Sequence, residues 1–66
     1  MANSAIKRIE KYAINGKKQD PATFWKLWET ASLMQDPRER FADKEALDGG
    51  EVVRLGRLAF QIVYAE

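Results

Sequence analysis

Two Asp-Pro pairs, Asp20-Pro21 and Asp36-Pro37, divide this chain of 66 residues. An aspartate placed just before a helix accepts hydrogen bonds from the free backbone N–H groups of the first turn. Proline is tolerated at the first helical position because the N–H that it lacks would have no partner there. We therefore predict that a helix begins at each pair, one over residues 21–35 and one over residues 37–47.

The segments before and after these two helices also show helical spacing. From Ser4, apolar side chains recur three and four positions apart, and Asn15-Gly16 is able to end a helix because both residues tolerate the left-handed conformation. After Gly49-Gly50, polar residues recur at intervals of three and four along residues 51–66. The four segments together predict an all-α fold, a compact small helical domain of about four helices, with residues 1–66 forming a single domain.

The last segment is open to a second interpretation. A β-hairpin turning at Gly56-Arg57 would place five apolar residues on one face: Val53, Leu55, Leu58, Phe60 and Ile62. The residue types of this segment favour strands, and a glycine inside a helix costs about 1 kcal/mol. The alternative fold is therefore α+β, with three helices followed by a C-terminal β-hairpin.

The sequence contains neither cysteine nor histidine, which removes disulfides, zinc fingers, thiol nucleophiles and imidazole bases. No spacing places a base beside a hydroxyl group, and the glycines match no phosphate-binding loop. Three carboxylates share a face of the predicted helix over residues 37–47, but a convex helix face does not converge on a cation. We expect no catalytic, cofactor-binding or metal-binding residues, no cofactor and no enzymatic activity.

The cluster from Phe24 to Trp28 gives the most specific functional indication. At 100° per residue, an apolar stripe that includes Phe24, Trp28 and Met34 faces the core, while Trp25 points about 130° away from its centre. Tryptophan frequently anchors protein interfaces, although a helix that is buried on two sides would instead place this residue in the core. We predict a partner-binding surface with two apolar anchors and a polar rim, formed by Trp25, Leu33, Lys26 and Glu29.

The net charge of +1 is unevenly distributed along the chain. Residues 1–18 carry five basic side chains against one acidic side chain, whereas residues 36–51 carry six acidic against three basic side chains. The five basic residues are Lys7, Arg8, Lys11, Lys17 and Lys18. Three uses are open for them: contacts with nucleic-acid phosphates, an ordinary solvated face, or docking on the acidic segment of a second copy.

We therefore expect a non-enzymatic protein-protein interaction module, such as a small adaptor, inhibitor or accessory factor of the size that phages often encode. Its partner would be another protein, with self-association as a further use of the same surface. The alternative function is a small nucleic-acid-binding regulator that uses the basic N-terminal residues. Since no secretory signal pattern and no apolar run of about 18 residues occurs, we expect no membrane association and a cytoplasmic location.

Overall fold

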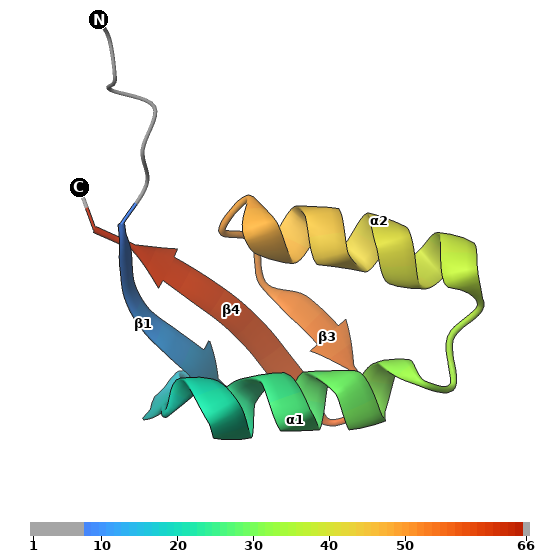
Figure 1. The fold of residues 1–66 in the computed structure, drawn as a ribbon, viewed down its shortest axis with the longest axis horizontal. Coiled ribbons are helices and arrows are strands. Elements are labelled where there is room, and N and C mark those ends of the chain that lie inside the picture. Colours follow the sequence, from blue (N-terminus) through green and yellow to red (C-terminus); the bar gives the residue numbers. More distant parts are fainter. Residues whose placement is uncertain (1–7, 66) are drawn as a thin grey trace, which may run out of the picture.

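The structure, a computed structural model, describes residues 8–65. Its elements follow in the order β1 (Ile9–Ile14), β2 (Lys17–Gln19), α1 (Pro21–Ser32), α2 (Pro37–Asp48), β3 (Val53–Leu55) and β4 (Leu58–Tyr64). The strands form one antiparallel sheet in the order β2-β1-β4-β3, and both helices pack on the same side of it (Figure 1). The fold is a small two-layer α+β domain.

The all-α prediction is wrong at both ends of the described chain. The helix expected from Ser4 begins outside the described residues, and its described part forms β1 instead. Asn15 and Gly16 have φ angles of 53° and 80°, the two left-handed conformations that a type I′ hairpin turn requires. Helix ends and hairpin turns share this requirement, so the same two residues are compatible with either element.

The pairing of β1 with β4 explains why the spacing of the first segment is misleading. Tyr12 lies opposite Ile62 and Ile14 lies opposite Phe60, whereas the register shifts between Ile9 and Lys11. This shift is a β-bulge, which adds one residue to a strand and interrupts its alternation of faces. A strand with a bulge near its start loses the period of two that would distinguish it from a helix.

The C-terminal segment forms the β-hairpin of the alternative prediction. β3 and β4 pair around Gly56-Arg57, with Val53 opposite Phe60 and Leu55 opposite Leu58. Gly56 has a φ of 64°, a conformation that glycine adopts without steric cost. The predicted fourth helix is therefore replaced by strands over residues 53–64. Of the three helices in the α+β alternative, the described residues contain only the two that follow the Asp-Pro pairs.

Both helix starts predicted from the Asp-Pro pairs are confirmed. The Asp20 carboxylate accepts hydrogen bonds from the backbone N–H of Thr23 at 3.1 Å and from its hydroxyl at 2.6 Å. The Asp36 carboxylate accepts from the backbone N–H groups of Arg38 at 2.8 Å and Glu39 at 3.3 Å. Local capping thus defines where α1 and α2 begin, while α1 ends earlier than predicted, at residue 32.

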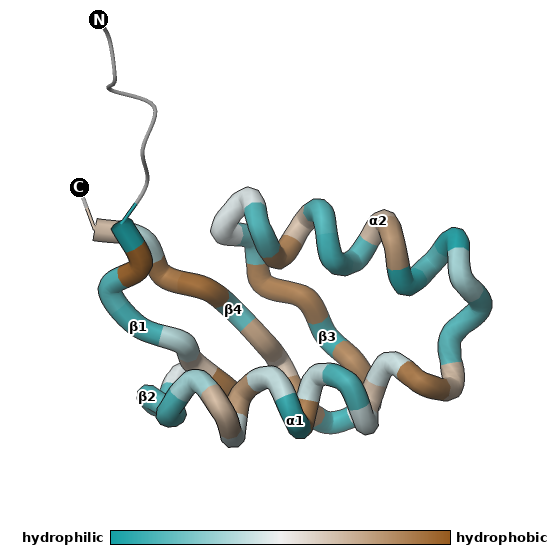
Figure 2. The backbone as a smooth tube through the Cα atoms, viewed as in Figure 1, coloured by the Kyte–Doolittle hydropathy of each residue, from teal (hydrophilic) through white to brown (hydrophobic). Residues whose placement is uncertain are grey.

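The core lies between the sheet and the helices. Phe60 of β4 is fully buried, and its ring meets Phe24 and Trp28 of α1 edge-on, with ring centres 5.5 Å and 5.2 Å apart. Helix α2 contributes Leu47 as its buried residue. Figure 2 shows hydrophobic residues along β3 and β4 and hydrophilic residues over much of α2. α1 therefore packs on the sheet through two buried aromatic rings, whereas α2 packs on it mainly at its C-terminal end.

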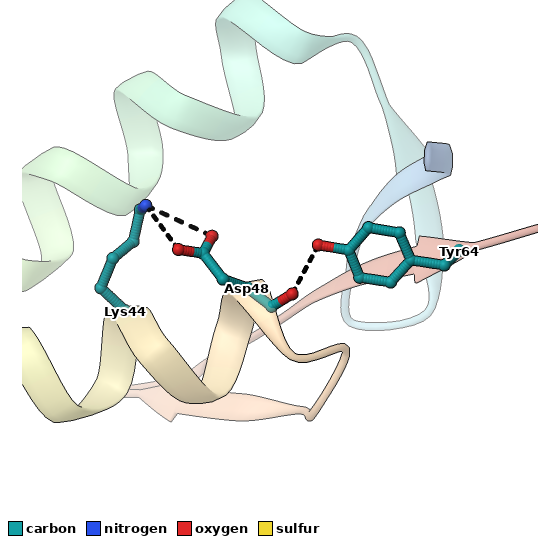
Figure 3. Close-up of polar contacts among 3 residues, drawn as sticks. All are labelled: Lys44, Asp48 and Tyr64. Carbon is teal, nitrogen blue, oxygen red and sulfur yellow. Dashed lines mark hydrogen bonds and ion pairs between the residues drawn. The ribbon is translucent and has the colours of Figure 1, made fainter. Parts of the chain in front are cut away.

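Hydrogen bonds hold that end of α2 over the sheet. The Tyr64 hydroxyl donates to the Asp48 carbonyl oxygen at 2.6 Å, and the Asp48 carboxylate pairs with Lys44 at 3.0 Å (Figure 3). The Gln61 side-chain amide donates to the Gly50 carbonyl oxygen at 3.0 Å.

Neither helix has the length and apolar content that a membrane span needs, as far as residues 8–65 are concerned.

Asn15 joins the two hairpin turns, which makes it a sensitive position for stability. Its backbone N–H donates to the Ala59 carbonyl oxygen at 2.8 Å, and its side-chain oxygen accepts from the Ala59 N–H at 2.9 Å. We expect Asn15→Ala to lower the free energy of unfolding by about 2 kcal/mol, because the side-chain hydrogen bond is lost and alanine is strained in the left-handed conformation. Asn15→Gly tolerates the backbone and should cost about 1 kcal/mol. Urea unfolding measures both values, and equal losses would contradict this account.

The cap of α1 should make stability depend on pH. Hydrogen bonds from the Thr23 hydroxyl and backbone N–H lower the pKa of Asp20 from its ordinary value of 3.8. Since the folded pKa lies below the unfolded one, the carboxylate stabilises the fold above pH 3.8, and this contribution is lost as the pH falls through the folded pKa. The stability difference between the wild type and Asp20→Asn should therefore shrink below pH 3.8.

An NMR titration of the Asp20 carboxyl carbon tests the cause directly. Thr23→Val removes the hydroxyl that contributes most to the shift, and it should return the pKa of Asp20 toward 3.8. An unchanged pKa in Thr23→Val would show that the hydroxyl bond is not the cause.

Candidate protein-binding groove

A groove of about 680 Å³ separates α1 from α2. One wall consists of α1 residues and the C-cap residue of that helix, and the other wall belongs to α2. The lining residues are Trp25, Lys26, Trp28, Glu29, Ser32 and Leu33 on the first wall and Pro37, Arg40, Phe41 and Lys44 on the second. Both aliphatic and aromatic side chains therefore reach this space from two sides.

Two hydrogen bonds join α2 to the end of α1 and to the segment that connects the helices. Arg40 donates from Nε to the Ser32 carbonyl oxygen at 3.3 Å. Gln35 donates from its side-chain amide to the Asp43 carboxylate at 2.6 Å. The apolar side chains nearby are left exposed, with Leu33 at 62% and Phe41 at 66% of their full accessible surface.

The structure brings together all the residues that the sequence suggested for partner binding. Trp25, Lys26, Glu29 and Leu33 line the α1 side of the same groove. Sequence reasoning missed the second wall, above all Phe41. The signal for Phe41 in the sequence is a lone phenylalanine on a strongly polar helix.

Trp25 belongs both to the margin of the core and to the groove. Its half-buried ring meets Phe24 edge-on at 5.0 Å and Tyr12 at 5.8 Å. Lys44 extends from the other helix and places its Nζ 5.4 Å from the centre of the Trp25 ring, within the range of a cation–π contact. The indole is thereby held in position by the core on one side and is reachable from the groove on the other.

The apolar stripe predicted on α1 is rotated relative to the real buried face. Phe24 and Trp28 are buried as expected, but Leu27 is 37% and Met34 is 93% exposed. Ser32 is buried instead, and its hydroxyl donates to the Glu29 carbonyl oxygen at 3.2 Å. The sheet contacts α1 on the side nearer the groove, which explains why Trp25 is closer to the core than its helical angle indicates.

The charges on the groove lining are mainly positive. Lys26, Arg40 and Lys44 face one carboxylate, that of Glu29. Lys44 is also paired with Asp48, although both side chains of that pair are about half exposed and water screens it. The rim therefore favours a ligand with negative charge.

The basic N-terminal residues that the structure describes do not share a helix face, because residues 9–14 form a strand. Arg8, Lys11, Lys17 and Lys18 lie on or beside the β1–β2 hairpin, and Lys7 lies outside the described residues. The four described residues are on a different part of the molecule from the groove.

Within residues 8–65 no cluster of three or more acidic side chains is placed to hold a metal ion. Comparisons of this chain with protein-family models, curated proteins and solved structures give no match.

The two apolar anchors should differ in their effect on stability. Trp25→Ala removes ring contacts with the core, and we expect a loss of about 2 kcal/mol in the free energy of unfolding, below the 3–5 kcal/mol of a fully buried aromatic. Leu33→Ala removes an exposed side chain and should change it by less than about 0.5 kcal/mol. Denaturant unfolding followed by circular dichroism measures both, and a loss for Leu33→Ala as large as for Trp25→Ala would contradict the assignment.

Proposed function

We propose that this protein is a non-enzymatic interaction module, an adaptor or accessory protein of the cytoplasm, whose groove between α1 and α2 binds a segment of another protein. The observation that carries the proposal is the pair of exposed apolar side chains, Leu33 and Phe41, on opposite walls of a groove that also contains Trp25. Exposed apolar side chains gathered in one concave place are typical of protein interaction sites.

The chemistry of the rim supports one kind of occupant, an amphipathic helix with apolar residues on one face and acidic residues beside them. The apolar face would contact Leu33, Phe41 and the exposed edge of Trp25. The acidic residues would lie near Lys26, Arg40 and Lys44, which outnumber the single carboxylate of the groove. Helix-in-groove binding is a common mode of peptide recognition.

The polar groups in the groove support binding over catalysis. Ser32 is buried, and its hydroxyl donates to a backbone carbonyl oxygen of the same helix. Arg40 is held by its hydrogen bond to the Ser32 carbonyl oxygen. Lys44 is held by its ion pair with Asp48 and by its contact with the Trp25 ring. Such groups are suited to hold a charged peptide.

The test uses two synthetic amphipathic helical peptides with the same apolar face, one with acidic and one with basic flanking residues. Binding is followed by tryptophan fluorescence and by backbone amide shifts in NMR spectra. We expect the acidic peptide to bind at least about tenfold more tightly than the basic one, with the largest shifts in α1 and α2.

Matched variants locate the site. Leu33→Gln and Phe41→Gln should each weaken binding of the acidic peptide by about tenfold or more, the loss expected for an interface anchor. Met34→Gln is the control, because Met34 is exposed and adjacent but does not line the groove.

Equal binding of both peptides, or equal effects of Met34→Gln and Phe41→Gln, would overturn the proposal. So would a dimer of the wild type that Phe41→Gln converts to a monomer in sedimentation, since a second copy would then cover the groove.

A further inference from the structure

The face of the sheet opposite the helices carries a different surface. In each strand, residues that alternate with the buried core positions lie on this face. The strand pairing places Ala13 beside Lys18 and Gln61, Arg54 beside Ala59, and Lys11 beside Val63. Both helices pack on the other side with Phe60 and Ile62, so no helix of residues 8–65 covers this face.

The charged side chains at these positions are all basic. Lys18 and Arg54 are exposed and Lys11 is half exposed, and none of the three takes part in an ion pair among residues 8–65. The acidic residue nearest to them along the strands is Glu10, at the bulge of β1. This face therefore has more basic than acidic side chains, although Glu10 and Asp20 line one hollow together with Lys11 and Lys18.

The whole molecule is divided in the same way. The strands and their turns, residues 8–19 and 52–65, contain six basic residues and one acidic residue, a net charge of +5. Residues 20–51, which include both helices, contain four basic and eight acidic residues, a net charge of −4. The two layers are therefore oppositely charged overall, and a polyanion is attracted to the sheet side. The three cations that line the groove between the helices are a local exception within the acidic layer.

The shape of this face fits a duplex better than a single strand. The central strands place Ala13, Ala59 and Gln61 on this face between the basic edge strands, β2 with Lys18 and β3 with Arg54, and Ala13 is buried beneath its neighbours. Three strand spacings separate these edges by about 14 Å, close to the ~12 Å width of the DNA major groove. Single-strand binding relies on exposed aromatic side chains for stacking, whereas Tyr12 and Phe60 pack on the helical side.

We infer that the helix-free face of the sheet binds the phosphate backbone of double-stranded DNA, with Lys18 and Arg54 contacting phosphates on the two sides of a groove. Lys11 and the turn residue Arg57 add positive charge around this contact. The binding is independent of base sequence, because no helix of residues 8–65 lies on this face to enter a groove and read bases. The peptide groove between the helices faces the other way and stays accessible, so one molecule can hold a protein segment and a duplex together.

The test measures fluorescence anisotropy of a labelled mixed-sequence DNA duplex, and of one of its single strands, from low to physiological salt. We expect the duplex to bind more tightly, with an affinity that falls linearly with the logarithm of salt concentration. Lys18→Gln and Arg54→Gln should each weaken duplex binding and reduce the salt slope by about 1, while Glu10→Gln should strengthen it.

Arg38→Gln is the matched control, because Arg38 is an exposed cation on α2 and its substitution changes the net charge by the same amount. It should leave the slope unchanged, as should Phe41→Gln in the peptide groove, and circular dichroism checks that each variant is folded.

The inference is overturned by a lack of duplex binding at low salt or by tighter binding of the single strand. It is also overturned if Arg38→Gln acts like Arg54→Gln, or if the wild type forms salt-sensitive dimers that Lys18→Gln and Arg54→Gln dissociate. These outcomes do not depend on whether the groove binds a peptide.

Discussion

The pairing of β1 with β4 is the contact on which the rest of the structure depends. It places the two hairpins side by side in one sheet, although they lie at opposite ends of the described chain. It also brings Ile14, Phe60 and Ile62 onto the face where the helices pack. A two-stranded hairpin alone is barely stable in water, whereas four strands with one apolar face can support a core. The stability of the fold therefore depends more on this non-local pairing than on either hairpin alone.

The two helices pack on the sheet to different extents because they contribute different side chains to the core. α1 buries two aromatic rings against Phe60, whereas α2 buries Leu47 near its C-terminal end and is tied there by Tyr64. A chain of this size has little apolar material, and most of it is used by α1 and the strands. The N-terminal half of α2 consequently covers no core, and the groove with its exposed Phe41 is the result.

Division of charge between the two layers is the second consequence of the topology. The basic residues of the N-terminal segment and those of the C-terminal hairpin lie far apart in sequence, but the sheet places them in the same layer. The acidic residues remain with the helices, where Asp20 and Asp36 are needed as caps. The net charge of +1 thus conceals two oppositely charged sides. One surface presents apolar groups between helices, and the other presents cations on a flat sheet.

The sequence by itself determined the features that depend on neighbouring residues. Asp20 and Asp36 cap helices through bonds to N–H groups two or three positions away, and Gly56 supports a tight turn through its own backbone freedom. The four groove residues suggested from α1 were accessible to sequence reasoning because they share one helix. Phe41 and Arg54 acquire their surroundings only from the packing of distant segments. The identity of residues 9–14 as a strand was likewise decided by tertiary structure, because helical spacing and Asn15-Gly16 permit either element and the hydrogen bonds to β2 and β4 select the strand.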